Sequence, residues 1–111
     1  MNRELSERER RVIEWVLAGE FDGVDELRAQ IPRLRVLGGC TCGCPSVDFV
    51  EPGLGLGSPI GREGYVPGLF YSVALFARGD GVLTTLDLLC TGEVTPTEFP
   101  DAAELVETVQ T

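Results

Sequence analysis

The sequence predicts an α+β fold: an N-terminal helical hairpin packed on an antiparallel sheet of three or four strands, followed by a short C-terminal helix. Three observations predict it. Apolar residues recur every three or four positions in residues 7–31, as in amphipathic helices. Two strongly apolar segments, residues 69–78 and 82–90, flank a turn sequence, as in a β-hairpin. The chain has 111 residues, so we expect a single domain over residues 1–111.

The first helix is predicted over residues 7–18. Ser6 and Glu9 have the spacing of a capping box, in which each side chain accepts a hydrogen bond from the other residue's backbone N–H. Gly19 is expected just after the helix, at the position where glycine is favoured. Trp15 flanks the apolar stripe of this helix, and we expect its indole to form a partly buried edge of the core.

A second helix is predicted over residues 23–30, with Asp22 as its N-cap. Pro32 should end it, because the residue before a proline is disfavoured in the α conformation. The turn between the two helices is short, so we expect a helical hairpin that covers one face of the sheet.

From Leu34 the apolar period changes to two, which is typical of an extended strand. The apolar positions are even up to Cys44 and odd after Pro45, at Val47 and Phe49. This phase shift predicts a bulge or turn at Pro45, which has no N–H for a ladder hydrogen bond. Residues 51–64 contain five glycines and two prolines, so we expect a loop there.

The hairpin is predicted to turn at Asp80-Gly81, a favoured two-residue turn sequence. That turn sets the register and places Leu75 opposite Leu86. The face expected under the helices consists of Tyr71, Val73, Leu75, Ala77, Leu86, Leu88 and Cys90. After an extended segment, Asp101 is expected to cap a last helix over residues 102–109.

The formal net charge is −9, and it is unevenly distributed. Residues 1–35 hold seven arginines and eight acids, whereas residues 36–111 hold two arginines and ten acids. Such an acidic surface repels phosphates, so nucleic acids and anionic membranes are not expected partners. It would suit a basic protein partner, although charge of this size also serves solubility alone. The N-terminus has no signal-peptide apolar core, which predicts a cytoplasmic protein.

Cys40, Cys42, Cys44 and Cys90 are the candidate metal ligands. Zinc takes four thiolates, but C-x-C-x-C on a strand separates successive Cβ atoms by ~7 Å, too far for one ion unless the chain kinks. A disulfide from one of the three to Cys90 is a second interpretation. The third is that the cysteines are reduced, metal-free packing residues, with Cys42 or Cys44 near Cys90. We prefer the third, because the spacing is unlike that of a zinc knuckle and the expected compartment is reducing.

Catalysis is not the function we expect from this sequence. The chain has no histidine, the residue that most often serves as general base, and its acids follow no catalytic motif. The sequence therefore favours a non-enzymatic interaction protein, of immunity or regulatory type, without a cofactor. The alternative is a metal-binding or redox-sensing module built on the four cysteines.

Several segments resemble small actinobacterial proteins of a family of unknown function. The resemblance includes Leu5-Ser6-x-x-Glu9, Phe21-x-Gly23, Cys42-Gly43-Cys44-Pro45-Ser46 and Glu98-Phe99-Pro100, and extends over most of the chain. The Cys-Gly-Cys-Pro-Ser stretch is its most specific part. It implies an actinobacterial source, and because no activity is established for such proteins it carries over no catalytic role.

Overall fold

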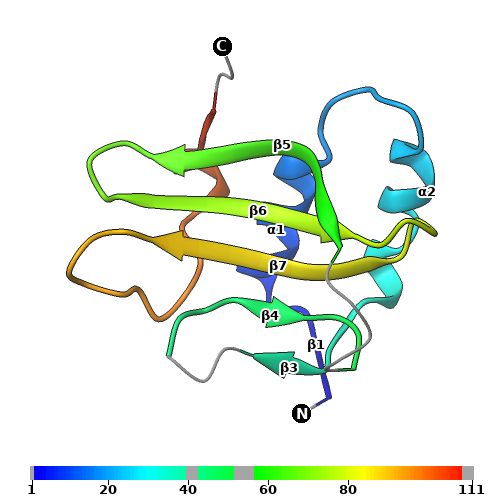
Figure 1. The fold of residues 1–111 in the computed structure, drawn as a ribbon, viewed down its shortest axis with the longest axis horizontal. Coiled ribbons are helices and arrows are strands. Elements are labelled where there is room, and N and C mark those ends of the chain that lie inside the picture. The colour runs from blue at the N-terminus through cyan, green and yellow to red at the C-terminus, as the bar shows by residue number, and fades with distance from the viewer. Residues whose placement is uncertain (1, 40–42, 52–56, 109–111) are drawn as a thin grey trace.

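The computed structural model describes residues 2–39, 43–51 and 57–108, and its fold class is α+β, as predicted. A six-stranded antiparallel sheet forms one layer, and helix α1 lies behind it in Figure 1. The described strands follow the order β3-β4-β7-β6-β5-β8, and β1 and β2 form a separate two-stranded ribbon. The sheet therefore has more strands than the three or four that were predicted.

The elements have the following bounds. The strands are β1 (Arg3–Glu4), β2 (Arg35–Val36), β3 (Gly38–Gly39), β4 (Val47–Asp48), β5 (Ser58–Val66), β6 (Tyr71–Ala77), β7 (Leu83–Cys90) and β8 (Val106–Glu107). The helices are α1 (Glu7–Val16) and α2 (Val24–Arg28), with 3-10 helices η1 (Ile31–Arg33) and η2 (Ala102–Glu104).

The predicted capping box of α1 is confirmed. Ser6 Oγ accepts a hydrogen bond from the Glu9 N–H at 3.1 Å, and Glu9 Oε1 accepts one from the Ser6 N–H at 2.8 Å. The helix ends two residues earlier than predicted, and Leu17 rather than Gly19 follows its last turn. Its apolar stripe is fully buried against the sheet.

The second helix of the predicted helical hairpin was wrong. Helix α2 has only five residues, and its N-cap is Gly23 with a φ of 87°, so Asp22 does not cap it. Pro32 does not simply end a helix but lies inside η1. A 3-10 turn tolerates proline near its start, because the first N–H groups of a helix have no intrahelical partner.

The predicted loop over residues 51–64 was wrong from residue 58 on, because Ser58–Val66 forms strand β5, and residues 52–56 lie outside the described residues. The glycines of β5 allow α1 to pack closely on this strand, and they do not mark a loop. A Cβ on Gly61 would lie 2.6 Å from the Val16 carbonyl oxygen, and a Cβ on Gly64 would lie 2.6 Å from the Trp15 ring. Glycine inside a strand often marks such a contact, here between helix and sheet.

The register of the β6–β7 hairpin is confirmed, with Leu75 opposite Leu86. The predicted two-residue turn was wrong. The Arg78 N–H donates to the Val82 carbonyl oxygen at 2.9 Å, so three residues form the loop. The register is nevertheless as predicted, because an irregularity between Phe76 and Ala77 compensates for the added residue. On the predicted core face, Val73, Leu75, Ala77, Leu86 and Leu88 are buried, whereas Tyr71 and Cys90 are half-buried.

The predicted helix over residues 102–109 was wrong. Asp101 does cap a helical turn, since Asp101 Oδ1 accepts a hydrogen bond from the Ala103 N–H at 3.0 Å, but that turn is the short 3-10 helix η2. Val106 and Glu107 then pair with β5, and the Thr108 N–H donates to the Glu63 carbonyl oxygen at 2.9 Å. Pairing with the edge of β5 satisfies backbone groups that a longer helix would have bonded internally.

The phase shift at Pro45 is present: Val47 and Phe49 are both buried on the core side of the segment that follows it. Before it, the extended segment is divided between β2 and β3. No helix among the described residues is long and apolar enough to cross a membrane.

Candidate interaction surface

The structure describes two of the four candidate metal ligands. Cys40 and Cys42 lie outside the described residues. The Cys44 thiol donates to Ser46 Oγ at 3.5 Å, and the Cys90 thiol donates to the Val94 carbonyl oxygen at 3.2 Å. In the described part of the chain, no three His, Cys, Asp or Glu side chains gather in a way that could hold a metal ion. The alternative of a metal-binding or redox-sensing module therefore stays a prediction.

A groove of about 570 Å³ lies beside Cys44, between the start of α1 and residues 97–99. Its charged side chains already satisfy one another. Arg3 forms two hydrogen bonds of 2.8 Å with the Glu9 carboxylate, and Arg8 donates to the Phe99 carbonyl oxygen at 3.1 Å. The Arg3, Glu9 and Arg8 side chains of the groove are thus held by contacts within the protein.

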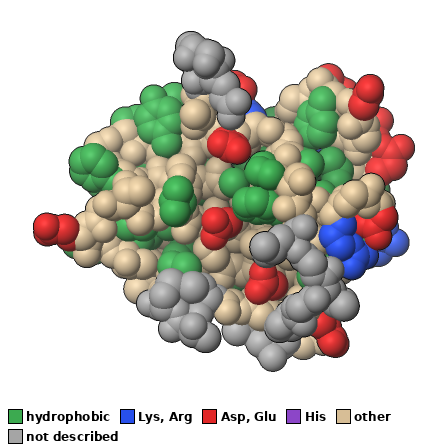
Figure 2. All heavy atoms as spheres, in the orientation of Figure 1, with side chains coloured by type: hydrophobic (Ala, Val, Ile, Leu, Met, Phe, Trp, Pro, Cys, Tyr) green, Lys and Arg blue, Asp and Glu red, His purple; other side chains and the backbone are tan. Residues whose placement is uncertain are grey.

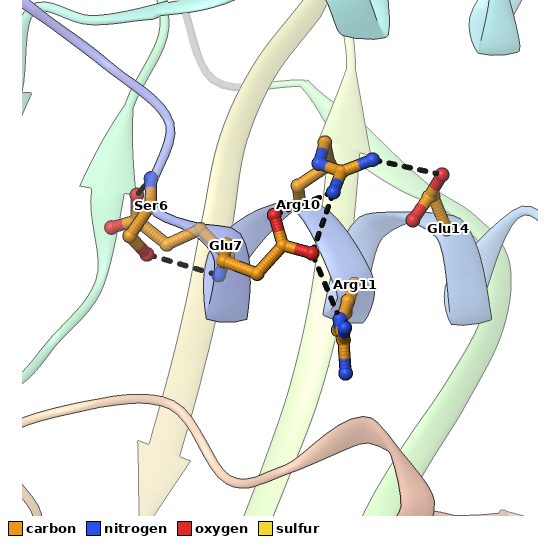
Figure 3. Close-up of polar contacts among 6 residues, drawn as sticks. Ser6, Glu7, Arg10, Arg11 and Glu14 are labelled. Carbon is orange, nitrogen blue, oxygen red and sulfur yellow. Dashed lines mark hydrogen bonds and ion pairs between the residues drawn. The ribbon is translucent and has the colours of Figure 1, made fainter.

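The carboxylates at the start of α1 have pKa values below their ordinary range. Burial opposes ionisation of Glu9, but hydrogen bonds from Arg3 and from the Ser6 backbone outweigh it and lower the pKa of this carboxyl. Hydrogen bonds from Arg10 and Arg11 lower the pKa of Glu7. Figure 3 shows this arrangement along α1. These groups therefore stabilise the helix and its contacts as ionised pairs.

The sheet face turned away from α1, here called the outer face, has no helix on it in Figure 1. Four residues of neighbouring strands lie side by side on it: Val106, Tyr65, Ser72 and Leu89. We call this set the outer apolar row. Val106 is 42% exposed, Tyr65 41% and Leu89 58%. Three large apolar side chains thus face solvent in one line across four strands.

Two carboxylates lie on the same face, beyond the outer apolar row. Ser46 Oγ donates to Asp87 Oδ1 at 2.7 Å and accepts a hydrogen bond from the Leu88 N–H at 2.9 Å. Thr85 Oγ1 donates to Asp48 Oδ1 at 3.1 Å. Figure 2 shows acidic and hydrophobic side chains next to each other over the sheet. Hydroxyl groups therefore orient both carboxylates without neutralising them.

Phe70 lies at the end of the sheet where β6 begins. It is the one described residue other than glycine with a positive φ, 58°, and its side chain is 71% exposed. The Thr91 N–H donates to the Phe70 carbonyl oxygen at 3.1 Å, so the residue that follows β7 holds this backbone in place. A left-handed conformation is costly for a bulky residue, and exposure of the ring means that little burial offsets the cost.

Ion pairs are unevenly distributed along the chain. On the helical side, arginines pair with acids, among them Arg3 with Glu9, Arg10 with Glu7, and Arg28 with Glu20 and Asp25. On the sheet side, Arg78 pairs with Asp80. Of the ten acids in residues 36–111, all described, only Asp80 and Glu98 form ion pairs with an arginine. Eight acids of residues 36–111 thus form no ion pair in the described residues, and Asp87 and Asp48 on the outer face are two of them.

Sequence reasoning predicted the acidic C-terminal two thirds but missed this surface. The outer apolar row depends on the pairing of β8 with β5. From the sequence, the β5 segment was predicted as a loop and the β8 segment as part of a helix. The hydrogen bonds of the Ser46 hydroxyl were also not predicted. The sequence signal for them was the position of Ser46 just after Pro45, where ladder hydrogen bonding is interrupted.

Comparisons with protein-family models, with curated proteins and with solved structures gave no match. The resemblance to actinobacterial proteins of unknown function therefore stays a prediction.

Proposed function

We propose that the protein is a non-enzymatic protein-interaction domain, of immunity or regulatory type, that binds a basic protein through its sheet side in the cytoplasm. The observation that supports the proposal is the uneven pairing of charges: six of the eight acids in residues 1–35 form ion pairs with arginines, whereas eight of the ten acids in residues 36–111, Asp48 and Asp87 among them, form none in the described residues. Unneutralised acids raise the local negative potential, which accelerates association with a positively charged surface. Phosphate-rich partners would be repelled by the same potential.

The groove near Cys44 gives no competing support for an enzyme. Arg3 and Glu9 are bonded to each other and Arg8 is bonded to the Phe99 carbonyl oxygen, so these charged groups are already engaged within the protein. The outer face, by contrast, combines exposed apolar side chains with oriented charges, which are the features of a recognition surface.

Affinity capture with the immobilised protein tests the proposal. Proteins captured from a lysate of the native cell would be identified, purified and bound again to the pure chain. We expect a basic partner that binds directly at low salt. If no captured protein binds directly, or if the direct partner is acidic, the proposal is wrong.

Two variants with equal net charge sharpen this test. Asp48→Asn with Asp87→Asn removes two charges from the outer face, and each amide oxygen can still accept the existing hydroxyl hydrogen bond. Glu20→Gln with Asp25→Asn removes two charges from the helical side, where these side chains are exposed. The first pair should weaken binding more than the second, because only the first lies on the sheet side.

A further inference from the structure

We propose that the partner docks on the outer apolar row, and that its docking surface consists of apolar side chains bordered on one side by arginines. This inference rests on the proposed function and adds to it the place of contact and the chemistry of the partner. The place follows from the geometry of the row, and the chemistry follows from the position of Asp87 and Asp48.

The row has the size and character of the centre of an interface. With strands ~4.8 Å apart, its four residues span ~14 Å, which is wider than a single α-helix. Tyr65 stands in it between Val106 and Ser72. Tyrosine is enriched at the centres of interfaces, because a rigid ring adds much contact area for little loss of conformational entropy.

Asp87 and Asp48 lie on the same side of the row. Asp87 is two residues from Leu89 along β7, ~7 Å away, and Thr85 is two residues further. Asp48 lies opposite Thr85, so both acids lie toward the β6–β7 turn. No arginine forms an ion pair with either carboxylate in the described residues. A partner with arginines on that side would supply the missing ion pairs, and a guanidinium can bond both carboxylate oxygens.

Phe70 lies on the other side of the row from Asp87 and Asp48. The exposed ring and left-handed backbone of this residue indicate a conformation maintained for contact rather than for stability. The docking surface is therefore polarised, with apolar groups toward Phe70 and acids toward the β6–β7 turn.

A second copy of the chain does not fit this surface. In a two-fold dimer the same patch faces itself, and each copy has a net charge of −9. Acids would meet acids across the contact, which is destabilising. A cationic partner has the complementary charge.

A synthetic probe peptide tests the location. The probe is an amphipathic helical peptide with a leucine stripe bordered on one side by arginines, and its control has glutamates in place of the arginines. Titrated into ¹⁵N-labelled protein, the arginine probe should shift the amide signals of Tyr65, Ser72, Asp87 and Leu89. The glutamate control should leave them unchanged.

Matched variants complete the experiment. Leu89→Ser and Asp87→Asn should each weaken the affinity for the arginine probe about tenfold. Phe21→Ser and Glu20→Gln, the equivalent changes on the helical side, should alter it less than about twofold. Each variant's amide spectrum first shows that it is folded.

The outcomes separate this inference from the proposed function. If the probe binds in a salt-dependent way but shifts signals on α1 and α2, the docking site and the sheet-side location are wrong, and only the preference for a basic partner stands. If neither peptide binds, or if both bind equally, the inference is wrong, and the capture experiment alone decides the proposed function. If the protein alone sediments as a dimer that Leu89→Ser dissociates, the surface serves self-association and the inference is overturned.

Discussion

The Arg62 guanidinium carbon lies 3.8 Å from the centroid of the Trp15 ring, and Arg62 Nε donates a hydrogen bond to the Trp15 carbonyl oxygen at 2.8 Å. This contact joins β5 to α1 and combines cation–π attraction with a hydrogen bond. It also has an electrostatic consequence. One of the two arginines in residues 36–111 is thereby directed to the helix, so it cannot neutralise the outer face.

The close packing of β5 under α1 predicts that Gly64 cannot be enlarged. Gly64→Ala should lower the free energy of unfolding by about 1–3 kcal/mol, because its Cβ would lie 2.6 Å from the Trp15 ring. Gly79→Ala is the control, since no atom lies within 4 Å of a Cβ there. Urea denaturation compares the two variants. Equal stabilities would contradict the close contact between helix and strand.

The ion pair of Glu9 predicts a pH-dependent contribution to stability. The folded-state pKa of Glu9 is lowered, so its contribution is present above the unfolded value of ~4.3 and is lost as pH falls through the folded pKa. Glu9→Gln should therefore destabilise the protein by about 1–3 kcal/mol at pH 7, and the deficit should shrink below pH ~4. Denaturation at several pH values measures this difference. A deficit that is constant from pH 7 to pH 3 would show that charge is not its cause.

The left-handed backbone of Phe70 predicts a separation between stability and binding. Phe70→Gly removes the steric cost of this conformation and should be more stable than Phe70→Ala, by up to about 1 kcal/mol. Both variants should bind the arginine probe more weakly than the wild type, because both lose the ring. Urea denaturation and probe titration check the two parts. A Phe70→Gly variant less stable than Phe70→Ala would mean that the backbone is not strained.

The cysteines are predicted to be reduced and metal-free. Protein purified without chelator should contain no zinc, and four thiols should titrate after unfolding without reductant. Fewer than four thiols in a metal-free sample would indicate a disulfide, with Cys90 as the first partner to examine. One equivalent of zinc, with a large drop in melting temperature on adding a chelator, would favour the metal-binding alternative, because loss of bound metal unfolds a small site.

Local patterns predicted the elements whose structure depends on local interactions. The Ser6–Glu9 capping box and the alternation along β6 and β7 are such cases. Strand β5 was missed because its glycines are typical of a loop, whereas their use depends on the position of α1, which local sequence does not show. The last helix was wrong for a related reason: pairing of Val106 with Tyr65 is a long-range interaction that outweighs local helical periodicity.

The candidate surface was less predictable than the fold. Composition showed the acidic surplus of residues 36–111, but not that the arginines pair elsewhere and leave eight of those acids without an ion pair. The hydroxyl hydrogen bonds to Asp87 and Asp48 join positions 37 or more residues apart in the chain. Only the folded arrangement brings these groups to the outer apolar row.

The salt dependence of association tests the central claim most directly. The association rate constant of the purified basic partner would be measured as added salt shortens the Debye length from ~30 to ~8 Å, for the wild type and for Asp48→Asn with Asp87→Asn. We predict that the wild-type rate falls steeply with salt, and that the double variant is slower at low salt with a shallower dependence. Equal rates for the two proteins at every salt concentration would contradict recognition through the outer face.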